Sequence, residues 1–120
     1  MTLSLIKKYF PLDVLSGNKF TYRTRFTYVN YRNKWYRELL VLSLRSRKRV
    51  KRRVEIVRYI PKGCREYDLG NFIQGCKPIP DGLIKRGYIW DDSPKWVDIS
   101  YKQIKDPKIK NGTTVTVHLD

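Results

Sequence analysis

The positive charge of this chain is confined to its first half, and any fold must accommodate it there. Residues 1–65 hold 18 lysines and arginines against three acidic residues, whereas residues 66–120 hold eight of each sign, so the first half accounts for the formal net charge of +15. A compact domain with this charge repels itself, and a polyanionic partner relieves the repulsion. We therefore expect nucleic-acid binding. A basic protein that is merely soluble, or of ribosomal type, is the alternative.

The charge is densest from Arg45 to Arg53, where seven of nine residues are basic. We predict a basic loop or helix end here, because the run leads into a segment rich in branched residues that is typical of a strand. Such a run is either a solvated face or a phosphate contact, and we favour the contact because like charges this dense are unfavourable side by side. The predicted DNA contacts in this run are Arg45, Arg47, Lys48, Arg49, Lys51, Arg52 and Arg53.

Arginines also alternate with aromatic residues in the segment 15–30. Arg23 and Arg25 stand between Tyr22, Phe26 and Tyr28. Interleaved arginines and aromatic rings can clamp phosphates and stack on bases. Alternating aromatic residues are equally typical of the buried face of a strand. Both readings stay open, and Arg23 and Arg25 are further candidate DNA contacts.

The hydrophobic pattern predicts a single α/β (α+β) domain over residues 1–120, with a small mixed β-sheet packed by two main helices. The segment 2–9 is a candidate edge strand. Trp35, Leu39 and Leu42 have helical spacing, which predicts a helix over 31–44 with Asn30 as its N-cap.

The second half of the chain predicts another helix and two strands. The second helix is expected to run from Asn71 to a left-handed Gly87, with a break and a new first turn near Pro78. Residues 96–104 and 113–119 alternate in polarity, and we predict that they pair as a hairpin.

Cellular location can be inferred from what the sequence lacks. Cys64 and Cys76 fit neither a CxxC metal site nor a disulfide framework. No apolar run approaches the roughly 18 residues of a membrane span. The first apolar stretch is interrupted at Lys7 and Lys8, which is unlike a signal peptide. We therefore expect a cytoplasmic protein without a membrane partner.

Six of the eleven acidic residues fall between Glu66 and Asp98. Carboxylates repel phosphate, so a protein that only coats DNA has little use for them, whereas one that holds a divalent metal against phosphate needs them. Such a metal activates a water and neutralises charge on the phosphate, and a lysine such as Lys77 can add to that stabilisation. His118 is the only histidine and lies far along the chain, which disfavours histidine-dependent catalysis.

The segment YDLGNFIQGCKPIPDGLIKRGYIWDDSPKWVDI resembles the signature of the RusA-type Holliday junction resolvases, small endodeoxyribonucleases of bacteria and their phages. That family carries a DxDN element, a helix, a glycine, a short hydrophobic turn and a paired DD. The corresponding residues here are 68–71 and 87–92, with Asp81 inside the helix. The order of elements and the basic first half agree over nearly all of the chain.

The resemblance implies an α/β homodimer that binds four-way DNA junctions and cuts two strands symmetrically in recombination and repair. It implies Mg²⁺, with Mn²⁺ as an alternative, and no small-molecule cofactor. By position, Asp68 matches the first aspartate of DxDN, Asp92 the second of the pair, and Asn71 the asparagine, which orients the site, caps the helix or contacts DNA. The family's helical lysine is replaced by Gln74, and Lys77 follows one turn later. The implied catalytic residues are Asp68, Asp92 and Lys77.

Gly70 departs from the pattern, because it stands where the family has its second aspartate. Two carboxylates are candidates to replace it. Glu66 would share a face with Asp68 if the segment were a strand, and Asp91 could turn inward beside Asp92. The candidate metal ligands are therefore Asp68, Asp92, Asp91 and Glu66. The alternative functions are a catalytically weak or inactive junction-binding protein of the same fold, and a basic RNA-binding protein.

Overall fold

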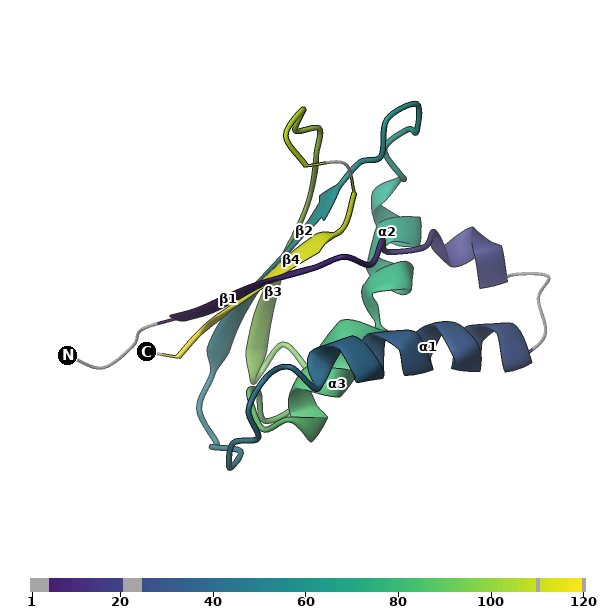
Figure 1. The fold of residues 1–120 in the computed structure, drawn as a ribbon. Coiled ribbons are helices and arrows are strands. Elements are labelled where there is room, and N and C mark those ends of the chain that lie inside the picture. The colour runs from purple at the N-terminus through teal and green to yellow at the C-terminus, as the bar shows by residue number, and fades with distance from the viewer. Residues whose placement is uncertain (1–4, 21–24, 110, 120) are drawn as a thin grey trace.

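The computed structural model describes residues 5–20, 25–109 and 111–119. It contains a four-stranded mixed sheet and helices that pack on it, which confirms the predicted α+β class (Figure 1). None of the helices in these ranges is long and apolar enough to cross a bilayer. The elements in chain order are β1 (Leu5–Phe10), η1 (Gly17–Phe20), α1 (Arg25–Leu39), β2 (Arg52–Tyr59), α2 (Leu69–Cys76), α3 (Pro78–Lys85), β3 (Val97–Ile104) and β4 (Thr113–His118).

The strand order is β1-β4-β2-β3, so the predicted hairpin between the last two strands is wrong. β4 inserts between β1 and β2 and runs antiparallel to both, while β3 pairs with β2 in parallel. Parallel neighbours cannot be joined by a tight turn, and the α2–α3 segment supplies the connection from β2 to β3. As predicted, β1 is an edge strand.

One hydrophobic core lies between the sheet and the helices, which gather on one face of the sheet in Figure 1. Alternate residues of each strand point into it, as the period of two requires. The helices meet these residues with one face each. The core residues that the strands and helices contribute are Phe10 of β1, Tyr31, Trp35 and Leu39 of α1, Val54 and Ile56 of β2, Phe72 and Cys76 of α2, Ile79 and Leu83 of α3, Val97 of β3, and Val115 and Val117 of β4.

Helix α1 already includes Arg25, so Asn30 is not its N-cap and the strand reading of residues 25–30 is wrong. The helical spacing of Trp35 and Leu39 extends backwards to Tyr31, which is also buried. The helix ends at Leu39, earlier than predicted, although Leu42 still packs into the core.

The second predicted helix is divided at Lys77, as the prolines required. α3 begins at Pro78, in the first turn, where a missing N–H leaves no helical hydrogen bond unmade. Gly87 closes it with φ +84°, and a β-carbon there would lie 1.7 Å from the carbonyl oxygen of Arg45. This close approach, which only glycine permits, brings the basic loop against the end of α3.

A buried arginine of β2 connects three parts of the chain. Arg58 is 1% exposed, and its Nε donates to Asp13 Oδ1 at 2.7 Å. Its Nη1 donates to Gln103 Oε1 at 2.9 Å, and the Gln103 amide in turn pairs with the backbone N–H and C=O of Tyr67. The guanidinium also lies 3.7 Å from the centre of the Tyr67 ring. This network fixes the residue immediately before Asp68.

We predict that Arg58→Met lowers the free energy of unfolding by about 3 kcal/mol, because it leaves Asp13 and Gln103 without their buried partner. The value is at the lower end for a broken buried pair because Asp13 is 24% exposed. Urea unfolding followed by circular dichroism measures it. Lys51→Met is the control: its pair with Asp98 has side chains 53% and 62% exposed and should contribute less than about 1 kcal/mol. Equal losses in the two variants would contradict the role of Arg58.

Candidate functional site

A cleft of about 420 Å³ lies between α1 and the α2–α3 pair. Successive turns of α1 provide one wall, and the junction of α2 with α3 provides the other. Lys77, a predicted catalytic residue, and Gln74 both line it. The full lining set is Tyr28, Arg32, Tyr36, Gln74, Lys77 and Asp81.

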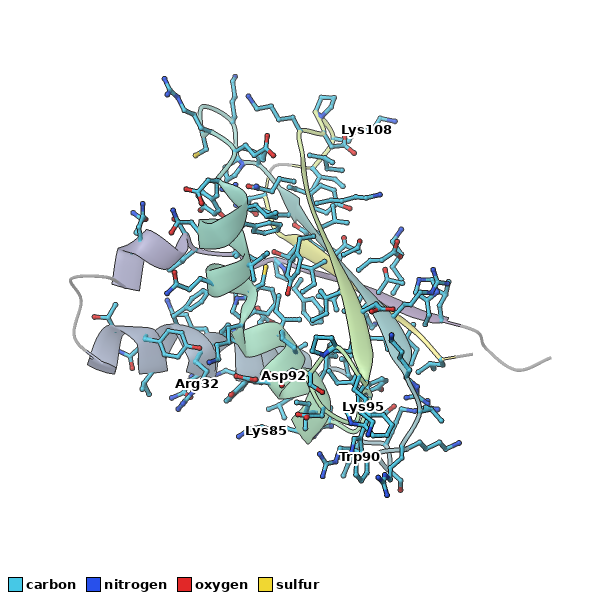
Figure 2. All side chains as sticks on the ribbon, turned by 180° about the vertical axis from the view of Figure 1, so that it is seen from behind. Arg32, Lys85, Trp90, Asp92, Lys95 and Lys108 are labelled. Atoms are coloured by element: carbon cyan, nitrogen blue, oxygen red, sulfur yellow. The ribbon has the colours of Figure 1, made fainter. Side chains whose placement is uncertain are left out.

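Asp81 is the acidic residue of this cleft, and it interacts with Asp92. Partial burial raises the pKa of the Asp81 carboxyl, and the negative charge of Asp92 raises that pKa further. Lys77, Lys85 and Arg32 act in the opposite direction without outweighing them. Figure 2 shows Arg32, Lys85 and Asp92 on the side of the molecule where α3 lies. The negative charge of Asp92 therefore acts on Asp81, a carboxylate that the predicted ligand set did not include.

The α1 wall combines two tyrosines with an arginine. Burial and then the Asp81 charge raise the pKa of both Tyr28 and Tyr36, so both phenols stay protonated at neutral pH. The Arg32 guanidinium lies 5.5 Å from the centre of the Tyr36 ring. Its Nε is buried and finds no hydrogen-bond acceptor within the described part of the chain. A buried donor without an acceptor is unfavourable, and an anionic oxygen entering the cleft would satisfy it.

Asp68 lies at the start of α2, where it caps the helix. Its Oδ1 accepts the backbone N–H of Asn71 at 2.9 Å, and its Oδ2 accepts the Asn71 side-chain amide at 2.7 Å. These hydrogen bonds hold the pKa of Asp68 below its usual value. The cap is therefore Asp68, and Asn71 orients the Asp68 carboxylate. The prediction of Asn71 as the cap is therefore wrong, and its roles in orienting a metal site and in contacting DNA stay predictions.

The predicted metal ligands are not gathered in one place. Within the described ranges, no three His, Cys, Asp or Glu side chains form a group that could hold a metal ion. Glu66 lies in an irregular segment, so the strand that would put it on one face with Asp68 does not exist. Asp91 is exposed in the turn after α3. Mg²⁺ usually takes only one or two protein carboxylates, with water and phosphate as its other ligands.

The structure has room for a carboxylate at residue 70, where the resemblance leads us to expect one and the chain has glycine. A β-carbon added to Gly70 would meet only the Oδ1 atom of Asp68, at an ordinary 3.6 Å. Gly70 precedes Gln74 by four residues, so the two lie on the same face of α2. A side chain at residue 70 would therefore project beside Asp68 along the face of α2 that borders the cleft.

Most of the predicted phosphate contacts are exposed on the loop between α1 and β2. Arg52 is the exception: it is 6% exposed, and its Nη1 donates to the Tyr88 carbonyl oxygen at 2.8 Å. Its prediction as a DNA contact is wrong, because the alternation of β2 turns this position toward the core. Arg23 and the side chain of Arg25 lie outside the described residues. The exposed set is Arg45, Arg47, Lys48, Arg49, Lys51 and Arg53.

Sequence reasoning missed Asp81 as a site residue. The usable signal was its spacing, because Lys77 and Asp81 are four residues apart and share a face once α3 begins at Pro78.

Comparison with known proteins adds no name to the site. No family model matches the chain, and no curated protein matches it.

Two substitutions of Asp68 can separate its role as the cap of α2 from a role in metal binding. Asp68→Asn keeps an oxygen that can accept the Asn71 N–H, so its urea midpoint should stay near that of the parent chain, whereas Asp68→Ala should unfold at lower urea. Urea unfolding of both variants measures this. Asn lacks the negative charge of Asp and binds Mg²⁺ poorly. Asp68→Asn therefore removes any role in metal binding and keeps the cap. Equal midpoints for Asn and Ala would contradict the capping role.

Proposed function

We propose that the protein binds branched DNA and hydrolyses it as a Mg²⁺-dependent endonuclease, as its resemblance to the RusA-type Holliday junction resolvases implies. The observation that carries this proposal is the cleft lined by Asp81, Lys77 and Arg32, together with the negative charge of Asp92, which acts on the Asp81 carboxyl. The exposed basic loop is tied to the C-terminal end of α3 through the Arg45 N–H, which donates to the Arg86 carbonyl oxygen at 2.9 Å. A carboxylate pair beside a cationic surface suits metal-assisted chemistry on a phosphodiester.

Each part of the site has a role in this proposal. Mg²⁺, or Mn²⁺, would supply an activated water and neutralise charge on the phosphate. Asp92 and Asp81 would hold the ion by their carboxylates. Lys77 and the buried Nε of Arg32 would bind phosphate oxygens that enter the cleft. A homodimer, as the resemblance implies, would provide two such sites for paired incisions.

The basic loop would grip the arms of the junction through their phosphates. Contacts of this kind give affinity that falls steeply with salt and little preference for sequence. They also relieve the repulsion among the five exposed cations of the loop. This part of the proposal does not depend on cleavage.

A second candidate is a junction-binding protein that does not cut. Two observations favour it: Gly70 removes one carboxylate, and both oxygens of Asp68 are engaged by Asn71. An RNA-binding protein would account for the charge, but it leaves Asp81 and Asp92 without a role.

An end-labelled four-way junction, with and without Mg²⁺, tests the proposal. We expect Mg²⁺-dependent paired incisions, reduced at least about 100-fold in Asp92→Asn because a metal ligand is lost. Asp98→Asn is the matched control, since Asp98 is an exposed aspartate of β3 paired only with Lys51 at the surface. Tight binding without incision at any Mg²⁺ concentration would leave the second candidate. Equal affinity for branched and linear DNA would count against both.

Gly70→Asp tests the alternative that the resemblance implies, a metal held beside Asp68, where the structure has room for a second carboxylate. We expect the Mg²⁺ concentration for half-maximal cleavage to fall on the order of tenfold as a negative ligand is added. Gly70→Asn is the control of equal size and no charge. If the two variants need the same Mg²⁺ concentration, or if cleavage by Gly70→Asp is slower, residue 70 does not face the metal.

A further inference from the structure

Two tryptophans meet the basic loop on the surface next to the Asp91–Asp92 turn. The ring centres of Trp90 and Trp96 lie 6.2 Å apart, edge to face. Neither ring belongs to the hydrophobic core. Figure 2 places Trp90 and Lys95 together at this end of the molecule. We define the Trp–Arg cluster as Arg47, Arg49, Trp90, Lys95 and Trp96.

Cations cover the tryptophan rings on their solvent side. The Arg47 guanidinium lies 4.8 Å from the centre of Trp90, and its Nη1 donates to the Trp90 carbonyl oxygen at 3.0 Å. Arg49 lies between the two rings, 5.6 Å from Trp90 and 5.7 Å from Trp96. Lys95 lies 5.2 Å from Trp96. All three cations are exposed, and both rings are half-buried.

The backbone beneath the cluster is held in place independently of these side chains. The Arg52 N–H donates to the Trp96 carbonyl oxygen at 3.0 Å, and the Arg52 guanidinium donates to Tyr88. Together with the hydrogen bond from Arg45 to Arg86, these contacts fix the basic loop against the segment 86–96. The two rings are therefore preorganised, which lowers the entropic cost of binding a ligand.

We propose that Trp90 and Trp96 stack on an unpaired base of DNA, while Arg47 and Arg49 bind the phosphates on either side of it. An exposed contact between a cation and an aromatic ring changes an equilibrium only about two- to fivefold, whereas stacking a base on an aromatic ring contributes about five- to 150-fold. A base therefore displaces a guanidinium from a ring at a net gain. The displaced guanidinium, still on the same loop, then pairs with a phosphate.

The location of the cluster gives this binding a use. Trp90 directly precedes Asp91 and Asp92, so a base held on the rings places its phosphates next to the Asp81–Asp92 pair. Bases at the branch point of a junction, or in an opened duplex, are free to stack in this way. The inference rests on the proposed DNA binding and not on cleavage.

Two single strands of equal charge test it: a twelve-nucleotide oligothymidylate and a twelve-unit abasic strand, each labelled for anisotropy. The chain has three tryptophans, and Trp35 is fully buried, so any quenching of emission by bound DNA reports on Trp90 and Trp96. We expect the thymidylate to bind at least about tenfold more tightly than the abasic strand and to quench the emission, which the abasic strand should not do.

Variants then separate stacking from phosphate binding. Trp90→Ala with Trp96→Ala should abolish the preference for thymidylate and leave the salt dependence unchanged, with circular dichroism to show that the fold persists. Arg47→Ala with Arg49→Ala should weaken both strands alike and reduce the salt slope by about 0.7 for each arginine.

The outcomes distinguish this inference from the proposed function. Equal affinity of the parent chain for the two strands, without quenching, would overturn the stacking role while DNA binding stands. Failure to bind either strand or a junction would overturn both. Because the comparison of strands uses the unaltered protein, it remains decisive even if the tryptophan variants do not fold.

Discussion

Arg58 carries its charge into the core of the protein, and the placement of α2 depends on how that charge is compensated. A buried guanidinium is tolerated only when it is paired and fully hydrogen-bonded. Asp13 supplies the opposite charge, and Gln103 supplies an acceptor that it shares with the backbone of Tyr67. The same contacts that satisfy Arg58 therefore fix the chain just before Asp68, and so determine where α2 begins.

The acidic residues divide into two groups with different partners. Asp68 is stabilised in its charged form by local hydrogen bonds, from the N-terminus of α2 and from the amide of Asn71. Asp81 and Asp92 lack such local hydrogen bonds among the described contacts, and their repulsion contributes to the raised pKa of Asp81. A cation relieves that repulsion, as a phosphate backbone relieves the repulsion within the basic loop.

Sequence reasoning succeeded where local chemistry decides and failed where strand partners decide. Pro78 and Gly87 marked the ends of α3 because their backbone limits act within a few residues. The hairpin of residues 96–104 with 113–119 failed, because alternation reveals a buried face but not which strand lies alongside. Asp81 was overlooked as a cleft residue because the cleft is formed by helices that lie far apart in the chain.

The sequence by itself determined the cationic first half, the α+β class, the break at Pro78 and the candidate acids, because composition, backbone limits and periodicity are local properties. Only the tertiary structure decided that β4 enters between β1 and β2, that Arg52 points inward, and that Asp81 lines a cleft with residues of α1. These choices depend on long-range packing, in which segments far apart in the chain share one core and one set of buried hydrogen bonds.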